Sequence, residues 1–490
     1  MTSETGSQVV VVGAGPAGLA AALAAARALR AAHGAKRAAG QGGVVLVDAA
    51  PWPGGQIWRA RRGVVHSAAE QTLAALAGLE VRVLPASRVV GALPHRTLLV
   101  DGPEGARRLR WNRLVLAGGA RERLLPFPGW TLPGVFGAGG LQALAKGGWP
   151  VAGRRVLVAG TGPLLLAAAA TLRREGAQLA GVVDEAGLGA HLRFAPALLA
   201  HPGKALDAGR LALALGGVRF RRGWRVVAAE GCGRVERVRL APVSGRGAGP
   251  VGSAREIVVE CDALAAGWGL LPDTGLAQML GCALAPNLGA SAVVVDAAQR
   301  TSVADVFAAG EATGVAGARA AALQGDIAGT TAAQDLIDQW AAGALREPHD
   351  AHESGARRGA GPAAARAPRR AAAAARRELA RERRFAAAVA RTFVPPADLA
   401  ARLEPDTLVC RCEDVPWSAL ASQPDLRSAK LATRCGMGHC QGRLCHGALS
   451  AITGSQPLAP HLPLMPVALG ALLAIDDDGP VSDPSLEPKK

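Results

Sequence analysis

Short apolar runs that end in glycine or in an acidic residue recur along this chain of 490 residues. They cover residues 8–12, 44–48, 113–119, 155–160, 181–185, 293–296 and 306–311. Runs of this length without polar alternation are typical of strands that are buried on both faces of a parallel sheet. Longer stretches rich in alanine and leucine lie between them and are typical of helices. The alternation predicts an α/β protein that is built from strand–helix–strand units.

The first unit carries a glycine pattern between its strand and its helix. Residues 13–18 read GAGPAG, a G-x-G-x-x-G motif in the strand–turn–helix context that makes the motif informative. Gly13 makes the tight turn, Gly15 lets a pyrophosphate approach the backbone, and Gly18 lets helix and strand pack closely. The next strand ends in Asp48, where a carboxylate binds ribose hydroxyls. The alternative for Asp48, a strand-terminal cap, fits the complete unit less well.

Two further segments are candidates for the same site. Residues 51–58 (PWPGGQIW) contain adjacent glycines, which either let the backbone pass close to a flat ring or form an ordinary turn. The strand at 306–309 ends in Gly310 and Glu311. The Glu311 carboxylate either meets ribityl or ribose hydroxyls or lies in a solvated loop. The residues alone leave both pairs of alternatives open.

A second strand–turn–helix unit contains Gly160 and Gly162 but has Leu165 in place of the third glycine. A branched side chain there should force helix and strand apart or displace a pyrophosphate. The following strand ends in Asp184 and Glu185, which would repel a 2′-phosphate. We therefore expect an altered or degraded site rather than a working nicotinamide site. A mononucleotide or another phosphate-bearing ligand stays open as an alternative.

The charge of the chain is strongly positive but local. The net charge is +16, and residues 357–384 alone hold ten arginines against two glutamates. Residues 341–375 are of low complexity and rich in Ala, Arg, Gly and Pro. This composition predicts a solvated linker and disfavours a nucleic-acid-binding groove.

No segment has the length and composition of a membrane span. The most apolar stretch near the C-terminus, residues 462–475, is 14 residues long and contains two prolines. The first eight residues lack the charged and apolar regions of a signal peptide. We expect a cytoplasmic protein, with peripheral association at the inner membrane as an alternative.

Five of the eight cysteines fall between residues 410 and 445. In the extended segment Cys410-Arg411-Cys412, alternate side chains share a face, so both sulfurs can face one metal centre. The stretch 435–445 (CGMGHCQGRLC) adds three cysteines and the glycines that let a loop wrap around such a centre. Four thiolates suit a zinc ion or a [2Fe–2S] cluster, and the C-x-C pair is less typical of zinc. Spacing alone does not say which four of the five cysteines are ligands.

These motifs resemble those of known proteins. GAGPAG, PGGQ, GTGPLL and AAGE resemble the thioredoxin-reductase-like flavoproteins with two dinucleotide folds, over roughly residues 7–340. CRCED and TRCGMGHCQGRLC resemble the [2Fe–2S] domain of the bacterioferritin-associated-ferredoxin type. The two together resemble the flavin and iron–sulfur subunits of opine oxidases, hydrogen cyanide synthase and D-hydroxyproline dehydrogenase.

The resemblance implies an α/β fold with two Rossmann-like domains, the second inserted in the first, and a small helical C-terminal domain. The FAD-binding domain would comprise residues 7–130 and 270–340, and the second nucleotide-binding domain residues 131–269. The linker at 341–375 would lead to a helix and the iron–sulfur domain at 376–480.

The resemblance also implies the cofactors and their ligands. FAD would bind at Gly13, Gly15, Gly18, Asp48, Gly310 and Glu311, although members of the wider fold often have Asp at the last position. The [2Fe–2S] cluster would bind to Cys410, Cys412, Cys440 and Cys445, which leaves Cys435 spare. A nucleotide at Gly160 and Gly162 stays open.

The implied function is that of an FAD-dependent electron-transfer subunit. A partner similar to D-amino-acid oxidase would oxidise an amino acid or an N-substituted amino acid of the opine, hydroxyproline or glycine class. Electrons would then pass through this chain to a quinone or another acceptor. One alternative is a self-contained NAD(P)H-dependent ferredoxin-type reductase, which Leu165 disfavours, and another is a partner-docking module without enzymatic activity. Cys232, Cys261 and Cys282 have no close partner in sequence, which disfavours a disulfide reductase, and no catalytic residue is assigned.

Overall fold

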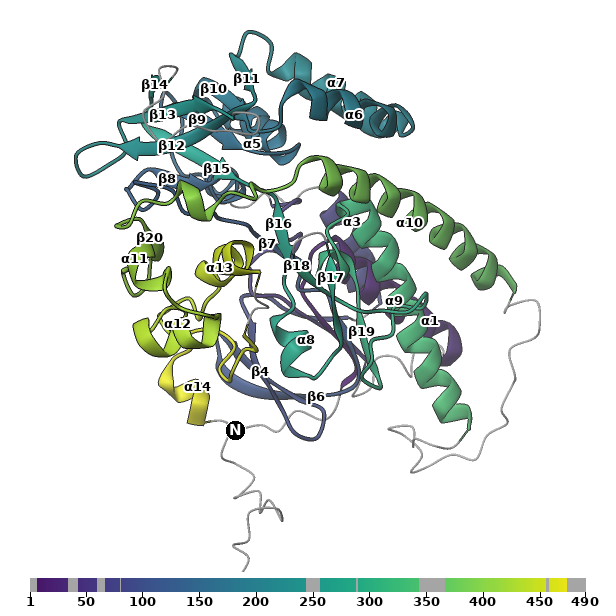
Figure 1. Ribbon diagram of the computed structural model, residues 1–490. Coiled ribbons are helices and arrows are strands. Elements are labelled where there is room, and N and C mark those ends of the chain that lie inside the picture. Colours follow the sequence, from purple (N-terminus) through teal and green to yellow (C-terminus); the bar gives the residue numbers. More distant parts are fainter. Residues whose placement is uncertain are drawn as a thin grey trace, which may run out of the picture.

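The structure is a computed structural model that describes residues 7–33, 43–59, 67–79, 81–243, 256–287, 290–342, 366–454 and 458–473. It contains two parallel-stranded sheets with covering helices and a small C-terminal unit that lies beside both (Figure 1). This arrangement confirms the predicted α/β fold class.

The first sheet is built around the buried run near the N-terminus. Strand β1 (Ser7–Val12) lies between β2 (Val44–Val47) and β6 (Gly105–Leu116), and all three strands run parallel. Strand β3 (Arg82–Leu84) extends the sheet beyond β2, and β19 (Val306–Ala308) pairs with β6 on the other side. Every residue of β2 is buried, in agreement with the absence of polar alternation in that run. Strands β4 (Arg88–Leu93) and β5 (Thr97–Gly102) continue antiparallel from β6.

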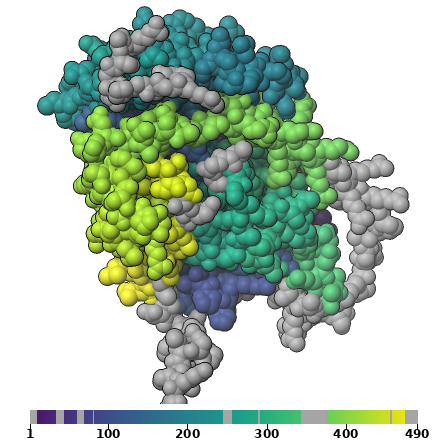
Figure 2. All heavy atoms as spheres, in the orientation of Figure 1, coloured from purple at the N-terminus to yellow at the C-terminus, as the bar shows by residue number. Residues whose placement is uncertain are grey.

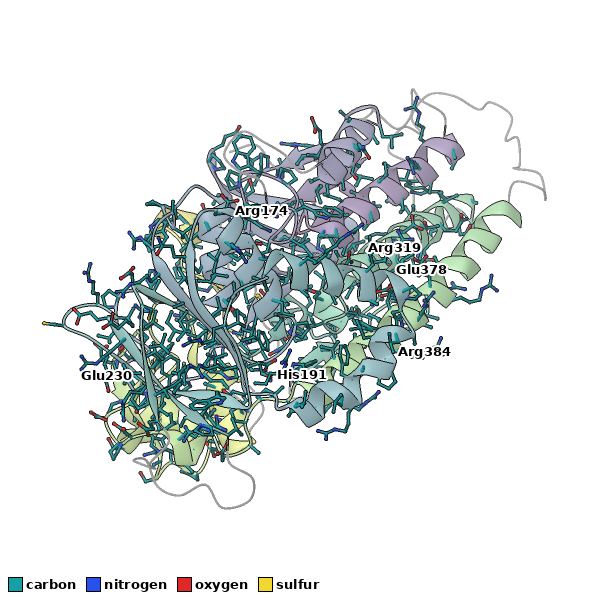
Figure 3. All side chains as sticks on the ribbon, turned by 90° about the horizontal axis from the view of Figure 1, so that it is seen from above. Arg174, His191, Glu230, Arg319, Glu378 and Arg384 are labelled. Carbon is teal, nitrogen blue, oxygen red and sulfur yellow. The ribbon has the colours of Figure 1, made fainter. Side chains whose placement is uncertain are left out.

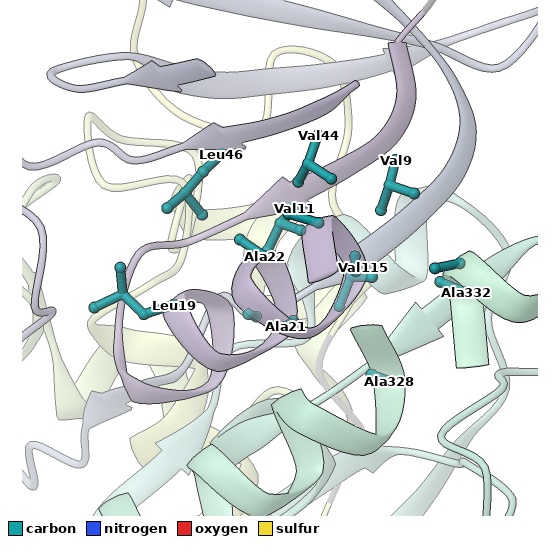
Figure 4. Packing of buried hydrophobic residues seen from close by; sticks show 14 of the residues in the cluster. Val9, Val11, Leu19, Ala21, Ala22, Val44, Leu46, Val115, Ala328 and Ala332 are labelled. Atoms are coloured by element: carbon teal, nitrogen blue, oxygen red, sulfur yellow. The ribbon is translucent and has the colours of Figure 1, made fainter. Parts of the chain in front are cut away.

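Small residues let two long helices pack directly on this sheet. Helix α1 (Pro16–His33) contacts α9 (Ala318–Ala341), and a Cβ atom built on Gly325 would lie only 2.0 Å from the carbonyl oxygen of Ala17. Helix α3 (Ser67–Ala77) lies against α1. The side chains that fill the space between helices and sheet are shown in Figure 4 and include Val9, Val11, Leu19, Leu46, Val115 and Ala328. The close approach of α1 and α9 fixes the glycine turn that begins α1.

The second sheet has the same parallel core. Its strand order is β11-β10-β9-β15-β8. The bounds are β8 (Val135–Gly137), β9 (Arg155–Gly160), β10 (Gln178–Asp184), β11 (Phe220–Arg222) and β15 (Ala263–Gly267). The helices are α4 (Ala138–Lys146), α5 (Leu164–Arg174), α6 (Leu188–Leu199) and α7 (Pro202–Ala214). A separate antiparallel sheet holds β12 (Trp224–Glu230), β13 (Arg237–Pro242) and β14 (Ile257–Glu260).

One pair of short strands joins the two units. The chain leaves the first unit through β7 (Ala120–Glu122) and returns through β16 (Leu270–Pro272), which pairs antiparallel with β7. It then forms α8 (Gly275–Met279), β17 (Leu284–Asn287), β18 (Ala290–Val293), β19, the 3-10 helix η1 (Gly310–Thr313) and α9. The second unit is thus inserted in the first, as the fold prediction requires.

The C-terminal part of the chain begins with a long basic helix. Helix α10 (Arg366–Thr392) starts inside the predicted linker, whose residues 343–365 lie outside the described residues. It runs along α9 and contacts α6 (Figure 1). Arg319 of α9 and Glu378 of α10 form an ion pair of 2.8 Å, and both are labelled in Figure 3.

The cysteine-containing segment folds into short elements beside both sheets. They are η2 (Ala400–Arg402), β20 (Leu408–Cys410), β21 (Val415–Pro416), α11 (Trp417–Leu420), α12 (Leu426–Thr433), α13 (Cys445–Thr453) and α14 (Leu469–Leu473). In the space-filling view these green and yellow segments cover the face between the two nucleotide-type units (Figure 2). The Trp130 indole donates a hydrogen bond of 2.6 Å to the Leu408 carbonyl, which ties the segment to the second unit. Among the described helices, none has the length and apolar character needed to span a membrane.

Candidate flavin cavity and cysteine cluster

A cavity of about 950 Å³ opens at the C-terminal ends of β1, β2 and β6. Its lining brings together residues that are far apart in sequence, among them five of the six predicted for FAD: Gly13, Gly15, Asp48, Gly310 and Glu311. Ligands of parallel α/β sheets bind at this end of the strands, because the loops that follow the strands converge there. The cavity is therefore the candidate flavin site.

The glycines of the first turn have different surroundings. A Cβ atom on Gly18 would lie 1.6 Å from the carbonyl oxygen of Gly13, so Gly18 serves the packing of helix against turn. A Cβ atom on Gly15 would meet only the Cα atom of Gly55, at 3.9 Å. Gly15 thus presents open backbone to the cavity, at the N-terminus of α1, where an anion is favoured.

The PGGQ segment packs on this turn. The Gly54 amide donates to the Ala14 carbonyl over 2.8 Å, and a Cβ atom on Gly55 would lie 3.0 Å from the Cα atom of Gly15. Gly55, Gln56 and Ile57 line the cavity. The segment is therefore a turn whose backbone faces the candidate flavin site, which combines the two alternatives of the sequence analysis.

Both predicted acids lie at the cavity and are largely buried. Asp48 directly follows β2 and accepts hydrogen bonds from the backbone amides of Ala14 and Ala50. Glu311 lies in η1 and accepts a hydrogen bond from the Gly317 amide. Burial raises the pKa of each carboxyl above its usual value, against the opposing effect of these hydrogen bonds. Asp48 thus combines the role of a strand-terminal cap with a place in the cavity wall.

The cavity also contains charged residues that the sequence analysis did not single out. Arg121 and Glu122 lie in β7 and line the cavity. The Glu122 carboxylate accepts hydrogen bonds from the Gly139 and Gly140 amides, 2.8 and 3.1 Å away, at the N-terminus of α4. Burial raises the pKa of Glu122. The signal in the sequence was the run Arg-Glu-Arg at 121–123, one residue after a buried strand and two glycines.

The five clustered cysteines form two groups. The sulfurs of Cys410, Cys435 and Cys445 all lie within 4.8 Å of one another, and all three residues are buried. Cys412 accepts a hydrogen bond from the backbone amide of Cys440 and also exchanges one with the Cys440 thiol. The structure therefore divides the predicted ligands: Cys410 and Cys445 lie in one group with Cys435, and Cys412 lies with Cys440 in the other.

Hydrogen bonding favours a negative sulfur at one member of the first group. Cys410 accepts hydrogen bonds from the thiols of Cys435 and Cys445 and from the amides of Gly436 and Glu413. These bonds hold the pKa of Cys410 far below its usual value, and the same contacts raise the pKa of Cys435 and Cys445. Two groups of thiols, one of them sharing negative charge, are a donor set that fits a [2Fe–2S] cluster.

The cysteine loop touches the wall of the candidate flavin cavity. The Arg121 guanidinium, which lines the cavity, donates a hydrogen bond of 2.6 Å to the carbonyl of Arg443, between Cys440 and Cys445. Desolvation lowers the pKa of Arg121, and the Asp273 carboxylate is the largest opposing influence, followed by Cys440 and Cys445. A single side chain thus contacts both candidate sites.

The second glycine turn, at Gly160 and Gly162, is covered by a side chain from a distant part of the chain. Phe393, directly after α10, packs so closely that a Cβ atom on Gly162 would lie 3.4 Å from the Phe393 Cβ atom. The Phe393 ring meets His191 edge-on with centroids 5.5 Å apart. The His191 Nε2 atom lies 3.2 Å from the carboxylate of Asp184, the acid that ends β10. The pyrophosphate and ribose positions of a dinucleotide therefore have neighbours from within this chain.

The other features of the second turn concern its helix and the second acid of the following strand. Helix α5 begins at Leu164, one position later than α1 begins relative to its own turn. Leu165 is buried in the core of the second unit. Glu185 accepts hydrogen bonds from the Trp268 indole and from Arg402, at 2.7 and 2.9 Å. Nothing in the local sequence indicated that Phe393 would lie over Gly162.

Comparisons with known proteins agree with this fold. Residues 7–335 match the family model described as pyridine nucleotide-disulphide oxidoreductase. Hydrogen cyanide synthase subunit HcnB of Pseudomonas protegens is 34% identical, over 96% of this chain and 98% of that protein. An opine oxidase subunit of Agrobacterium tumefaciens is 32% identical, over 91% of this chain and 85% of that protein.

A solved structure has a similar fold over almost the whole chain. L-proline dehydrogenase from P. horikoshii superposes with a TM-score of 0.60 and 21% identity, over 96% of this chain and 80% of that one. The resemblance drawn from the motifs is thereby confirmed. The chain belongs to the pyridine nucleotide-disulphide oxidoreductase family, in the group that contains HcnB of hydrogen cyanide synthase and its opine oxidase counterpart, and is an FAD-dependent oxidoreductase.

Proposed function

We propose that this chain is the electron-transfer subunit of a multi-subunit dehydrogenase or oxidase, with one FAD and one [2Fe–2S] cluster. The substrate is an amino acid or an N-substituted amino acid of the opine, hydroxyproline or glycine class. A partner flavin subunit similar to D-amino-acid oxidase oxidises its C–N bond. Electrons reach this chain from the partner and leave to a quinone or a similar acceptor. The names of the relatives, each of them a subunit, support this placement.

The observation that carries the proposal is the contact between Arg121 and Arg443. Arg121 lines the cavity that contains the predicted flavin residues, and its hydrogen bond reaches the loop between two predicted cluster ligands. When bound, FAD accepts electrons in pairs, and a [2Fe–2S] cluster passes them on singly. Arg121 holds the cysteine loop against the cavity wall and thereby keeps the two sites adjacent.

The residues that would hold each cofactor follow from their positions. Gly15 leaves backbone open to a pyrophosphate at the start of α1, and Asp48 and Glu311 present carboxylates to ribose and ribityl hydroxyls. Cys410, Cys412, Cys440 and Cys445 supply the four thiolates. Apolar residues surround the buried Cys410 and Cys445, while Cys412 and Cys440 are partly exposed. Phe393 and His191 cover the second turn, which argues against NAD(P)H as the source of electrons.

The cluster is tested by metal analysis of anaerobically purified protein. We expect about two irons and two acid-labile sulfides per chain, the content of one [2Fe–2S] centre. Single Cys→Ser substitutions at Cys410, Cys412, Cys440 and Cys445 should each remove or destabilise the centre. Stoichiometric zinc without iron would contradict the proposal.

The electron path is tested with Arg121→Leu in the complex with its partner. The variant should keep flavin and iron, while the cluster is reduced by substrate at least tenfold more slowly than in the wild type. Arg154→Leu, which removes an arginine that stacks on Trp149 in the second unit, is the matched control and should not change this rate. Equal rates in Arg121→Leu and wild type would contradict the path.

A further inference from the structure

A second, smaller cavity lies beside the candidate flavin cavity. Its volume is about 80 Å³, whereas pockets for drug-sized ligands and cofactors measure about 300 Å³ or more. Arg121, Asp273 and Arg443 line both cavities, while Lys430 lines the smaller one only. The smaller cavity therefore shares a wall with the candidate flavin site and has room for a small molecule, but not for a nucleotide.

The walls of this smaller cavity come from several segments of the chain. Arg121 lies in β7, Lys430 lies in α12, and Arg443 lies in the loop between two predicted cluster ligands. Residues of the C-terminal segment 458–464 form a further wall. A backbone hydrogen bond of 2.6 Å from the Leu464 amide ties that segment to β4. The cavity thus exists only where the flavin unit, the cysteine segment and the C-terminal segment meet.

Three of the wall residues carry a positive charge at neutral pH. Among the described residues, neither the Lys430 ammonium nor the Arg443 guanidinium has a hydrogen-bond or ion-pair partner. The Nε atom of Arg121 is buried and also has no hydrogen-bond partner in that part of the chain. Asp273 is the one carboxylate among the described wall residues. Like charges around a small space repel one another, and a bound anion would remove this repulsion and accept hydrogen bonds from the unpaired donors.

We propose that the smaller cavity binds a small oxyanion, a carboxylate or a phosphate, between Arg121, Lys430 and Arg443. Guanidinium and ammonium groups are the donors with which proteins bind both kinds of oxyanion. The inference goes beyond the proposed function, because the three cations and the cavity belong to this chain alone. If the proposed function holds, the amino-acid substrate or its oxidised product is one source of the carboxylate, and free phosphate is the other source of an oxyanion.

The test is isothermal titration calorimetry of the full, cofactor-loaded chain with acetate and with inorganic phosphate, at constant ionic strength. We expect saturable binding of one anion per chain, and the more tightly bound of the two probes identifies the source. Lys430→Gln removes an unpaired charge and should weaken binding at least about tenfold. Lys430→Arg keeps the charge and should keep the binding. Lys204→Gln is the matched control, because Lys204 lies outside the cavity and 3.4 Å from Glu382, and it should bind like the wild type.

Two results would overturn the oxyanion site. No saturable binding by the wild type would mean that these cations only offset the negative charge of the iron–sulfur cluster. Equal binding by Lys430→Gln and the wild type would mean that the anion binds elsewhere. Lys430→Met, which lacks the charge but keeps a long side chain, decides this point if Lys430→Gln does not fold. A chain that contains no iron would contradict the proposed function instead, and the same titration of that chain would still decide the oxyanion site.

Discussion

The two glycine-rich turns of this chain are built alike and meet different neighbours. Each follows a buried central strand, and each is followed by a second strand that ends in an acid, Asp48 or Asp184. The first turn opens on a cavity of about 950 Å³, with no side chain close to Gly15. The second turn is covered by Phe393, and its acid has His191 as a neighbour.

This difference shows that a dinucleotide-binding fold does not by itself provide an open dinucleotide-binding site. The strand, the turn and the helix N-terminus provide the electrostatic setting for a phosphate in both units. What differs is the space in front of the turn, which depends on segments that arrive from elsewhere in the chain. In the second unit that segment is the end of α10, held in place by aromatic contacts of Phe385 and Phe393 with Phe194.

The largest effect is expected for Gly15→Val. An added Cβ atom at this position meets only the Gly55 Cα atom, at 3.9 Å, and the valine side chain fills the approach of the pyrophosphate, so flavin binding should be abolished. The measurement is the flavin absorbance of the purified protein. Gly203→Val in α7, where an added Cβ atom also meets nothing within 4 Å, is the control and should keep its flavin. Retention of flavin by Gly15→Val would refute the assignment of the first turn.

Asp48 and Asp184 occupy equivalent places in the two units, so the same substitution at each tests whether the two turns differ in FAD binding. Asp48→Asn should weaken FAD binding roughly 10- to 100-fold, because a hydrogen bond to a charged group contributes about 1.5–3 kcal/mol. Asp184→Asn should leave FAD affinity unchanged, since Asp184 lies in the second unit. Reconstitution of apoprotein with FAD, followed by flavin fluorescence, gives both dissociation constants. Equal effects of the two substitutions would mean that the two folds do not differ in the way described.

Opening the second turn should produce a smaller change. Phe393→Ala removes the ring that covers Gly162, so NADH should bind about tenfold more tightly than to the wild type, or about 1.4 kcal/mol. Isothermal titration calorimetry measures this directly. Phe220→Ala, in β11 of the same unit and with its ring against Arg222, is the control and should bind NADH like the wild type. Tight NADH binding by the wild type would show that Phe393 does not close the turn.

The smallest effect concerns the pH dependence of stability at Asp184. Burial raises the pKa of this carboxyl above 3.8, so the folded state holds the proton more tightly than the unfolded state. The resulting stability is complete below pH 3.8 and is lost as the pH rises through the folded pKa. Asp184→Asn lacks this loss, so its melting temperature relative to the wild type should rise between about pH 4 and 7, by on the order of 1–2 °C. A difference that falls or stays constant over this range would contradict the assigned direction.

The features that could be predicted from the sequence are those that depend on residues close together along the chain. The glycine turn at Gly13 and the acid at Asp48 belong to one strand–turn–helix–strand unit, so their spacing was sufficient. The contact between Arg121 and Arg443 joins residues 322 positions apart, and no local pattern encodes it. The position of Phe393 over the second turn could not be predicted either. Phe393 follows α10, and α10 packs on α6 and α9, which are distant from it in sequence.

The cysteines show where pattern and geometry diverge. Spacing predicted a metal centre but not its ligands, and the resemblance set Cys435 aside as spare. The structure places Cys435 in contact with two of the predicted ligands. This proximity appears only when the segments between residues 410 and 445 are folded, so the spacing of the cysteines did not indicate it.

The central claim is that electrons do not enter through the second nucleotide fold. The most direct test is anaerobic mixing of the isolated, FAD-containing chain with NADH and with NADPH, followed by flavin absorbance. Because Phe393 covers Gly162 and His191 lies at Asp184, we predict no reduction by NADPH and at most slow, partial reduction by NADH. Rapid and complete bleaching of the flavin by either nucleotide would contradict the account and identify the chain as a self-contained reductase.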